Sequence, residues 1–202
     1  MALLSVALTG NIASGKSTVL EFFRRFGAHT TDADAMVRAL QQPGTPVFDA
    51  VVSRFGPSVV RPDGQLARDR LRTIVFHDPG ARADLEAIVH PAVQRQRVIL
   101  EQAAVAEGAR VIVHDIPLLF ESGNPSEFDR VVLVDAPVKR RRAWLIEHRG
   151  LPPDEADRMI AAQQPSEGKR AASHYIIEND ADLATLERRA RRVWDRLVAD
   201  AG

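Results

Sequence analysis

The chain has 202 residues, enough for one domain with a substantial buried core. Its 27 basic and 27 acidic side chains cancel to a formal net charge of zero, and 45% of its residues are hydrophobic. These values exclude a disordered or fibrous chain and give no sign of binding to nucleic acid or to a membrane surface. Because the molecule has no overall field to attract an anion, we expect any anionic ligand to be held by a local group of residues.

The absence of cysteine excludes disulfide bonds and thiolate metal sites, and it fits a reducing compartment. We therefore expect a cytoplasmic protein. Residues 3–8 are apolar but lack a basic leader, so they predict a buried strand and not a signal sequence. No stretch approaches the roughly 18 uninterrupted apolar residues of a membrane span, so we expect no membrane-embedded segment.

Short apolar runs rich in β-branched residues alternate with longer helical patterns along the chain. The clearest are residues 3–8, 111–113, 131–134 and 175–177, with residues 28–31 as a weaker candidate. Runs that are apolar on both faces are typical of parallel strands covered by helices on each side. The pattern therefore predicts an α/β fold.

A long helical stretch separates the second and third of these runs. Residues 33–110 show helical periodicity, and turn signals, among them Pro43-Gly44 and His90-Pro91, divide them into four or five helices. The stretch is too long for a simple crossover, so we interpret it as an insertion that supplies a second binding surface.

Two further helical patterns follow. Residues 137–164 are rich in arginine and break at residues 150–153, and residues 182–199 predict one amphipathic helix.

A glycine-rich motif stands directly after the first predicted strand. It matches the G-x4-G-K-[ST] pattern and is followed by an apolar helical run; its residues are Gly10, Asn11, Ile12, Ala13, Ser14, Gly15, Lys16 and Ser17. Such a loop points backbone N–H groups and a helix N-terminus at phosphate oxygens. Lys16 can then bridge the terminal phosphates, and the Ser17 hydroxyl can bind a magnesium ion shared with the nucleotide. The motif predicts a nucleotide-phosphate site, and the alternative is a strand-to-helix turn without a ligand.

Two aspartates follow the second predicted strand, where strand carboxyl ends meet the ligand crevice of such folds. Either Asp32 or Asp34 could accept a proton from an attacking hydroxyl group. The alternative is that Asp32 caps the helix that Asp34 begins, and the spacing alone does not decide between them. Arg38 lies one turn beyond Asp34, either as a surface ion-pair partner or as a contact for substrate phosphate.

Weaker candidates lie further along the chain. Asp115 and Asp135 each end an apolar run, where a magnesium carboxylate could stand. The basic residues 139–142 and Arg149 form either a solvated helix face or a mobile lid that brings arginines to phosphates. The six histidines show no ligand spacing, so we expect no protein metal site built from them.

Together these residues resemble the dephospho-CoA kinase family, a member of the nucleotide-kinase-like P-loop group, nearly from end to end. The most distinctive matches are His90-Pro91 and the segment at residues 115–121, Asp-Ile-Pro-Leu-Leu-Phe-Glu. Residues 32–38 are similar to the D-A-D-x-x-x-R segment of the family. Gln163, Lys169 and Asn179 match late family positions.

The resemblance implies a three-layer P-loop NTPase fold with about five parallel strands in one domain. The core would be residues 1–32, 108–137 and 165–202, with a helical CoA-substrate insertion at 33–107 and a small lid at 138–164. The implied reaction transfers the γ-phosphoryl group of ATP to the 3′-hydroxyl of dephospho-CoA, with Mg²⁺ as cofactor. We expect a monomer with ATP and dephospho-CoA as its ligands and no nucleic-acid or membrane partner.

The resemblance also assigns roles to residues. Asp34 would be the proton acceptor with Asp32 beside it, and Lys16 would act in catalysis. ATP would bind to residues 10–18, ending at Thr18, and to Arg142 and Arg149. The dephospho-CoA side would include Asp32 and Asp34 together with Arg38, His90, Pro91 and Leu118.

The chain departs from the family pattern at several positions. The family usually has glycine where this chain has Asn11 and Ala13. Its lid usually presents arginines where this chain has Trp144 and His148, so Arg142 and Arg149 are the expected substitutes. Two other functions remain as alternatives: another small-molecule P-loop kinase, and a nucleotide-binding switch that regulates a partner.

Overall fold

The computed structural model describes residues 3–202, which divide into two compact units. Of the described residues, 3–31 and 103–202 form the sheet unit, and 32–102 form the helical unit. Each unit has a hydrophobic core of its own.

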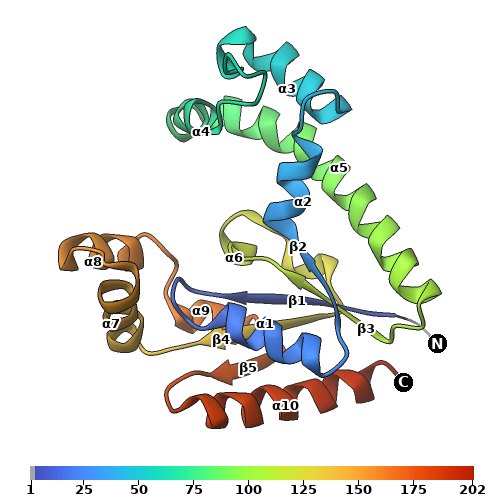
Figure 1. Cartoon of the computed structure of the whole chain (residues 1–202), viewed down its shortest axis with the longest axis vertical. Coiled ribbons are helices and arrows are strands. Elements are labelled where there is room, and N and C mark those ends of the chain that lie inside the picture. The colour runs from blue at the N-terminus through green and yellow to red at the C-terminus, as the bar shows by residue number, and fades with distance from the viewer. Residues whose placement is uncertain (1–2) are drawn as a thin grey trace. The chain divides into compact units, whose positions relative to one another are not determined.

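The sheet unit is built on five strands in the spatial order β2-β3-β1-β4-β5 (Figure 1). The pairs β1–β3, β1–β4 and β4–β5 are all parallel. The strands are β1 (Leu4–Gly10), β2 (His29–Asp32), β3 (Val111–Asp115), β4 (Arg130–Asp135) and β5 (Tyr175–Glu178). All five lie at the predicted places, so the predicted α/β fold with a parallel sheet is confirmed.

Two helices cover one face of this sheet. They are α1 (Lys16–Arg25) and α10 (Leu183–Asp200), which lie side by side beneath the strands (Figure 1). Val6 and Leu8 of β1 point into their core, where Phe23 packs against Trp194 with ring centroids 5.8 Å apart. The intervening Ala7 packs on the opposite face with Leu119, as the two-residue period of a strand requires.

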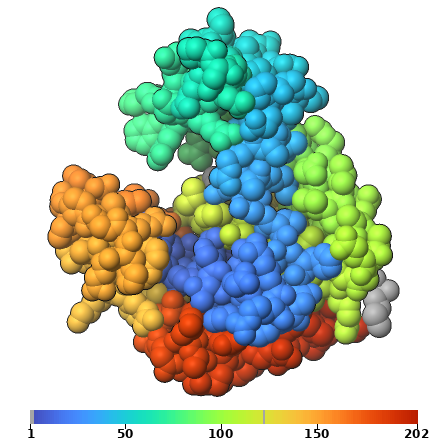
Figure 2. All heavy atoms as spheres, in the orientation of Figure 1, coloured from blue at the N-terminus to red at the C-terminus, as the bar shows by residue number. Residues whose placement is uncertain are grey.

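Further helices of the sheet unit connect the strands. The short α6 (Leu119–Ser122) follows β3. The segment predicted to form a lid, for which the word lid is kept below, contains α7 (Val138–Arg149) and α8 (Pro153–Ala161). The lid break at residues 150–153 is confirmed, because Gly150 ends α7 with a left-handed φ of 65°. The helix α9 (Ser166–Ala171) then leads back to β5. Figure 2 shows the lid in orange, beside the blue surface of the chain's N-terminal part.

The helical unit is a small cluster of helices around its own core. Its elements are α2 (Ala33–Leu40), α3 (Pro46–Phe55), the 3-10 turn η1 (Pro57–Val59), α4 (Arg68–His77) and most of α5 (Pro79–Ala106). Val51, Val59 and Leu71 are buried at the centre. The predicted insertion is therefore helical.

The predicted break at His90-Pro91 is wrong, because α5 runs through Pro91 without interruption. Proline in a helix interior removes one hydrogen bond and costs about 3 kcal/mol. Here Val89 and Ala92 on either side are buried in the core of the helical unit. Their burial offsets the lost hydrogen bond, and the helix continues.

None of the helices formed by the described residues combines the length and the apolar character that a membrane crossing requires.

We expect α10 to stabilise the sheet unit chiefly through its buried stripe. Leu197 is fully buried, whereas Leu183 on the same helix is 62% exposed. Leu197→Ala should lower the free energy of unfolding by about 2–5 kcal/mol, and Leu183→Ala should change it by less than about 0.5 kcal/mol. Urea denaturation of the two variants measures both values. Equal losses would show that α10 is not held by this stripe.

Candidate active site

The phosphate loop, residues 10–17, joins β1 to α1 through a backbone path that requires glycine at two places. Gly15 has φ 90°, and a Cβ atom there would lie 2.4 Å from the Asn179 side-chain nitrogen. A Cβ atom on Gly10 would lie 2.6 Å from the Val134 carbonyl oxygen. Larger residues at these positions therefore cannot be accommodated without displacing backbone or loop contacts.

The N-terminus of α1 is left open. No side chain among the described residues caps it, and its first turn contains no acidic residue. The first N–H groups of a helix have no partner within the helix, and the helix dipole makes this end electropositive. The arrangement suits an anion such as a phosphate group.

Residues distant in sequence hold the loop in this path. The backbone N–H of Ile12 donates to Gln163 Oε1 over 2.7 Å, and Asn179 Nδ2 donates to the Ser14 carbonyl over 2.8 Å. Gln163 follows α8 and Asn179 follows β5. Residues at both ends of the segment from α8 to β5 therefore support the loop.

Lys169 of α9 contacts the phosphate loop from the protein interior. Its side chain is 1% exposed, and Nζ donates to Asn11 Oδ1 and to Glu121 Oε1, each over 2.5 Å. The Asn11 amide also donates to Ser166 Oγ over 3.1 Å. The side chain of a loop residue is thus held at both ends by α9.

Lys16, the first residue of α1, forms an ion pair with Asp115 at the end of β3. Their side chains are 13% and 14% exposed, so the pair is largely shielded from water. Of the two aspartates that end apolar runs, Asp115 therefore lies at the phosphate loop. Asp135 instead accepts from Ser166 Oγ over 2.9 Å and from Arg170 Nη1 over 2.7 Å.

A pocket of about 520 Å³ opens in front of the loop. Besides residues 10–18, it is lined by Pro117, Arg140, Trp144, Arg149, Gln163, Asn179, Leu183 and Leu186. It combines phosphate-binding N–H groups and cationic side chains at one part with aromatic and aliphatic surface at another. A nucleotide, which has an anionic end and a flat apolar base, requires both kinds of surface.

The basic residues of the lid have different surroundings. Arg149 lies over the Trp144 ring, with its guanidinium carbon 5.3 Å from the ring centroid. His148 stacks on the same indole, with ring centroids 5.4 Å apart. Arg142 is not among the residues that line the pocket. It binds Asp157 through two hydrogen bonds of 2.7 and 3.1 Å, which lower the pKa of that carboxyl group. Of the two arginines expected to bind ATP, the structure therefore brings only Arg149 to the pocket, together with Arg140.

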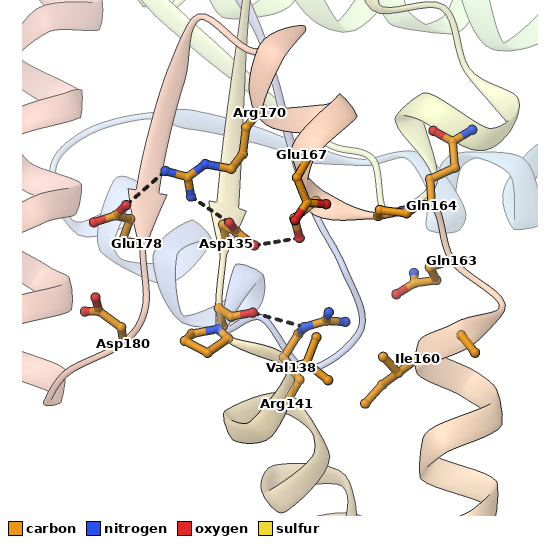
Figure 3. A pocket seen from close by; sticks show the side chains of 15 residues that line it. Asp135, Val138, Arg141, Ile160, Gln163, Gln164, Glu167, Arg170, Glu178 and Asp180 are labelled. Carbon is orange, nitrogen blue, oxygen red and sulfur yellow. Dashed lines mark hydrogen bonds and ion pairs between the residues drawn. The ribbon is translucent and has the colours of Figure 1, made fainter.

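Arg141 is buried at the base of the lid, 4% exposed, and its Nε donates to the Ala136 carbonyl over 3.1 Å. Burial lowers the pKa of this guanidinium group. It lines a second pocket of about 470 Å³, where Arg170 lies between Asp135 and Glu178 (Figure 3). Arg141 therefore belongs to the attachment of the lid.

Asp32, the last residue of β2, and Asp34, in the first turn of α2, have different environments. Asp32 caps α2, because its Oδ1 accepts from the Ala35 N–H over 2.9 Å, and its Oδ2 lies 3.8 Å from Arg38 Nη2. Asp34 is exposed in the first turn of α2 and makes no hydrogen bond or ion pair within residues 3–202. Helix capping thus occupies Asp32 and leaves the Asp34 carboxylate free.

The remaining expected substrate contacts lie on separate elements. His90 and Pro91 are exposed on α5, and Leu118 is 47% exposed just before α6. Leu118 belongs to the sheet unit, whereas His90 and Pro91 belong to the helical unit.

The described residues contain no group of three or more His, Cys, Asp or Glu side chains that could hold a metal ion by themselves. Ser17 is exposed in the first turn of α1, with Asp115 paired to the neighbouring Lys16. One hydroxyl beside a phosphate site fits Mg²⁺, which keeps several waters and takes substrate phosphates as ligands. The donor set fits a metal shared with the nucleotide.

The sequence alone assigns no specific contact to several residues at this site. Three of them match late family positions without a stated role: Gln163, Lys169 and Asn179. Arg140 belongs to the basic run at residues 139–142. Gln163, Asn179 and Arg140 line the pocket, and Lys169 contacts the loop beneath it, only in the folded chain. No local pattern could therefore assign these contacts.

Comparisons with known proteins agree with this geometry. The dephospho-CoA kinase family model matches residues 4–185. A dephospho-CoA kinase of Symbiobacterium thermophilum is 46% identical over 94% of this chain and 79% of its own length, and one of Streptomyces avermitilis is 43% identical over 97% and 95%. A solved structure of a Thermus thermophilus protein superposes with a TM-score of 0.80 and 34% identity, covering 98% of this chain and 99% of the other. The chain belongs to the dephospho-CoA kinase family.

Proposed function

We propose that this kinase transfers the γ-phosphoryl group of ATP to the 3′-hydroxyl of dephospho-CoA, giving coenzyme A and ADP. The observation that carries the proposal is the complete phosphate loop with the uncapped N-terminus of α1, in a chain of this family. No observation specifically supports the two alternative functions, a kinase for another alcohol and a nucleotide-binding switch.

ATP occupies the pocket in front of the loop in this proposal. The backbone N–H groups of residues 10–18 bind the phosphates, and Lys16 leaves Asp115 to neutralise the terminal phosphates. Arg149 and Arg140 add positive charge from the lid, and Arg142 contributes only by holding α7 against α8. Mg²⁺ shared between Ser17 and the phosphates would neutralise charge that develops during transfer.

Asp34 accepts the proton in this mechanism. The 3′-oxygen attacks the γ-phosphorus, the bond from that phosphorus to the β–γ bridging oxygen breaks, and the hydroxyl proton passes to the Asp34 carboxylate. Asp34 suits the role because its carboxylate is free, while Asp32 already accepts the Ala35 N–H. Asp32 keeps α2, and hence Asp34, in place.

The dephospho-CoA side is formed by the helical unit in this proposal. Arg38 and His90 are exposed there and supply cationic and polar surface for the acceptor. The exposed Pro91 and Leu118 of the sheet unit supply apolar contacts. The insertion at 33–107 is then the substrate-binding part and the lid at 138–164 the nucleotide-covering part of one domain. The proposal takes the protein to be a monomer whose ligands are ATP and dephospho-CoA, and the lack of cysteine supports a cytoplasmic location.

Replacement of the proposed base tests the mechanism and the acceptor together. The wild-type protein should release one ADP per dephospho-CoA consumed. Asp34→Asn should lower kcat by about 10²–10⁴-fold, the usual contribution of a positioned base, and should leave the Kd for ATP unchanged. A coupled ADP assay and calorimetry measure the two quantities.

Asp32→Asn is the matched control, since asparagine also caps a helix and only the charge is lost. We expect a much smaller fall in kcat. Full turnover by Asp34→Asn, with loss only in Asp32→Asn, would assign the base to Asp32. Turnover of another alcohol in place of dephospho-CoA would refute the proposed substrate.

The location of the nucleotide can be read from fluorescence, because the chain has two tryptophans. Trp144 lines the pocket and is 40% exposed, whereas Trp194 is 7% exposed in the core. In a Trp194→Phe variant, ATP should cause a saturable change in the emission of Trp144. A Trp144→Phe variant should bind ATP without a comparable change, and a response confined to Trp194 would place the nucleotide elsewhere.

A further inference from the structure

Lys169 is the most deeply buried cationic side chain described, with 1% of its surface exposed. An ammonium group loses its hydration on burial, and this is costly unless partners replace the water. At this depth the side chain does not reach a nucleotide in the pocket, whose lining does not include it. Its role must therefore be sought in the groups that it contacts.

Its two partners come from different parts of the sheet unit. Asn11 belongs to the phosphate loop, and Glu121 belongs to α6 after β3. The second carboxylate oxygen of Glu121, Oε2, is buried without a hydrogen-bond partner within residues 3–202. Glu121 therefore balances the charge of Lys169, while Asn11 is the partner whose position bears on the ligand.

The Asn11 side chain has its orientation fixed by this contact. An ammonium group only donates hydrogen bonds, so the amide oxygen must face Lys169 and the amide nitrogen must face Ser166. Ser166 in turn donates to Asp135 at the end of β4. The amide is thereby tied at both ends to α9, and α9 is tied to the sheet.

The Asn11 backbone takes part in the fold of the loop, because its carbonyl oxygen accepts the Ser14 N–H over 3.0 Å. A shift of Asn11 would therefore move the turn whose N–H groups face the phosphates. Misplacement by about 1 Å in a binding constellation is enough to weaken it substantially.

We propose that Lys169 is a positioning residue of the phosphate loop, which acts through the Asn11 side chain to set the loop N–H groups for nucleotide phosphates. Glu121 supplies the charge that allows the ammonium group to remain buried. The inference rests on the proposed nucleotide site, and it adds a residue that contacts neither ATP nor dephospho-CoA.

The test removes the contact without leaving a lone buried charge. The double variant Lys169→Met with Glu121→Gln replaces the ion pair by neutral side chains of similar size. We expect it to unfold at a urea concentration close to that of wild type. Its Kd for ATP, measured by calorimetry without an acceptor, should rise about tenfold, the effect of one charge-assisted hydrogen bond. The KM for dephospho-CoA should stay within about twofold of wild type, as an effect on the nucleotide side alone requires.

Asn11→Ala breaks the same contact from the loop side and is the second variant, should the double variant fail to fold. It should also weaken ATP binding. Adding it to the double variant should cause a smaller loss than it causes in wild type, because both changes remove the contact between Lys169 and Asn11. Folded variants that bind ATP as wild type does would overturn the proposal, and so would equal effects on both KM values. Since ATP binding is read without an acceptor, a wild-type protein that binds ATP but does not phosphorylate dephospho-CoA would refute the proposed substrate and leave this inference standing.

Discussion

The functional edge of the sheet depends on keeping the N-terminus of α1 open toward the pocket. The free N–H groups at the start of a helix normally bond to a side chain or to water. Here no side chain among residues 3–202 caps α1, and no acidic residue lies in its first turn. The backbone can present these N–H groups only because Gly15 takes φ 90° beside Asn179. Contacts from Gln163, Asn179 and Lys169 then hold the loop, so protein contacts fix its path.

Local charge at this edge is arranged in pairs, which explains how a chain of zero net charge can serve two polyanionic ligands. Lys16 is paired with Asp115, Lys169 with Glu121 and Arg170 with Asp135. Of these six side chains, only that of Lys16 belongs to a residue lining the pocket in front of the loop. In the proposed function, a bound phosphate therefore competes with Asp115 for Lys16. The other two pairs are part of the support beneath the loop.

The sequence was most informative where structure is local. Strand positions, the phosphate loop and the lid break at Gly150 all depend on short patterns and are found in the structure. The continuation of α5 through Pro91 was missed because it depends on burial of Val89 and Ala92, which a local rule about proline does not include. The environments of Asp32 and Asp34 were also undecided by spacing, and the structure shows Asp32 as the cap.

Contacts between distant residues could not be found from the sequence. Asn11 and Lys169 are 158 positions apart, and Ile12 and Gln163 are 151 apart, so only the folded sheet brings them together. For the same reason the exposed basic run of the lid could not be divided in advance into Arg149 and Arg140 at the pocket and Arg142 at Asp157. Residue type and spacing predicted the chemistry, and tertiary packing selects the side chains that perform it.

In the proposed function, a glycine-dependent loop at the start of α1 binds the phosphates of ATP. Calorimetry of ATP binding to Gly15→Ala tests this most directly, because an alanine would be strained at φ 90° and its Cβ would meet Asn179. We expect a folded protein whose Kd for ATP is raised by roughly tenfold or more. A folded Gly15→Ala protein with the ATP affinity of wild type would contradict it.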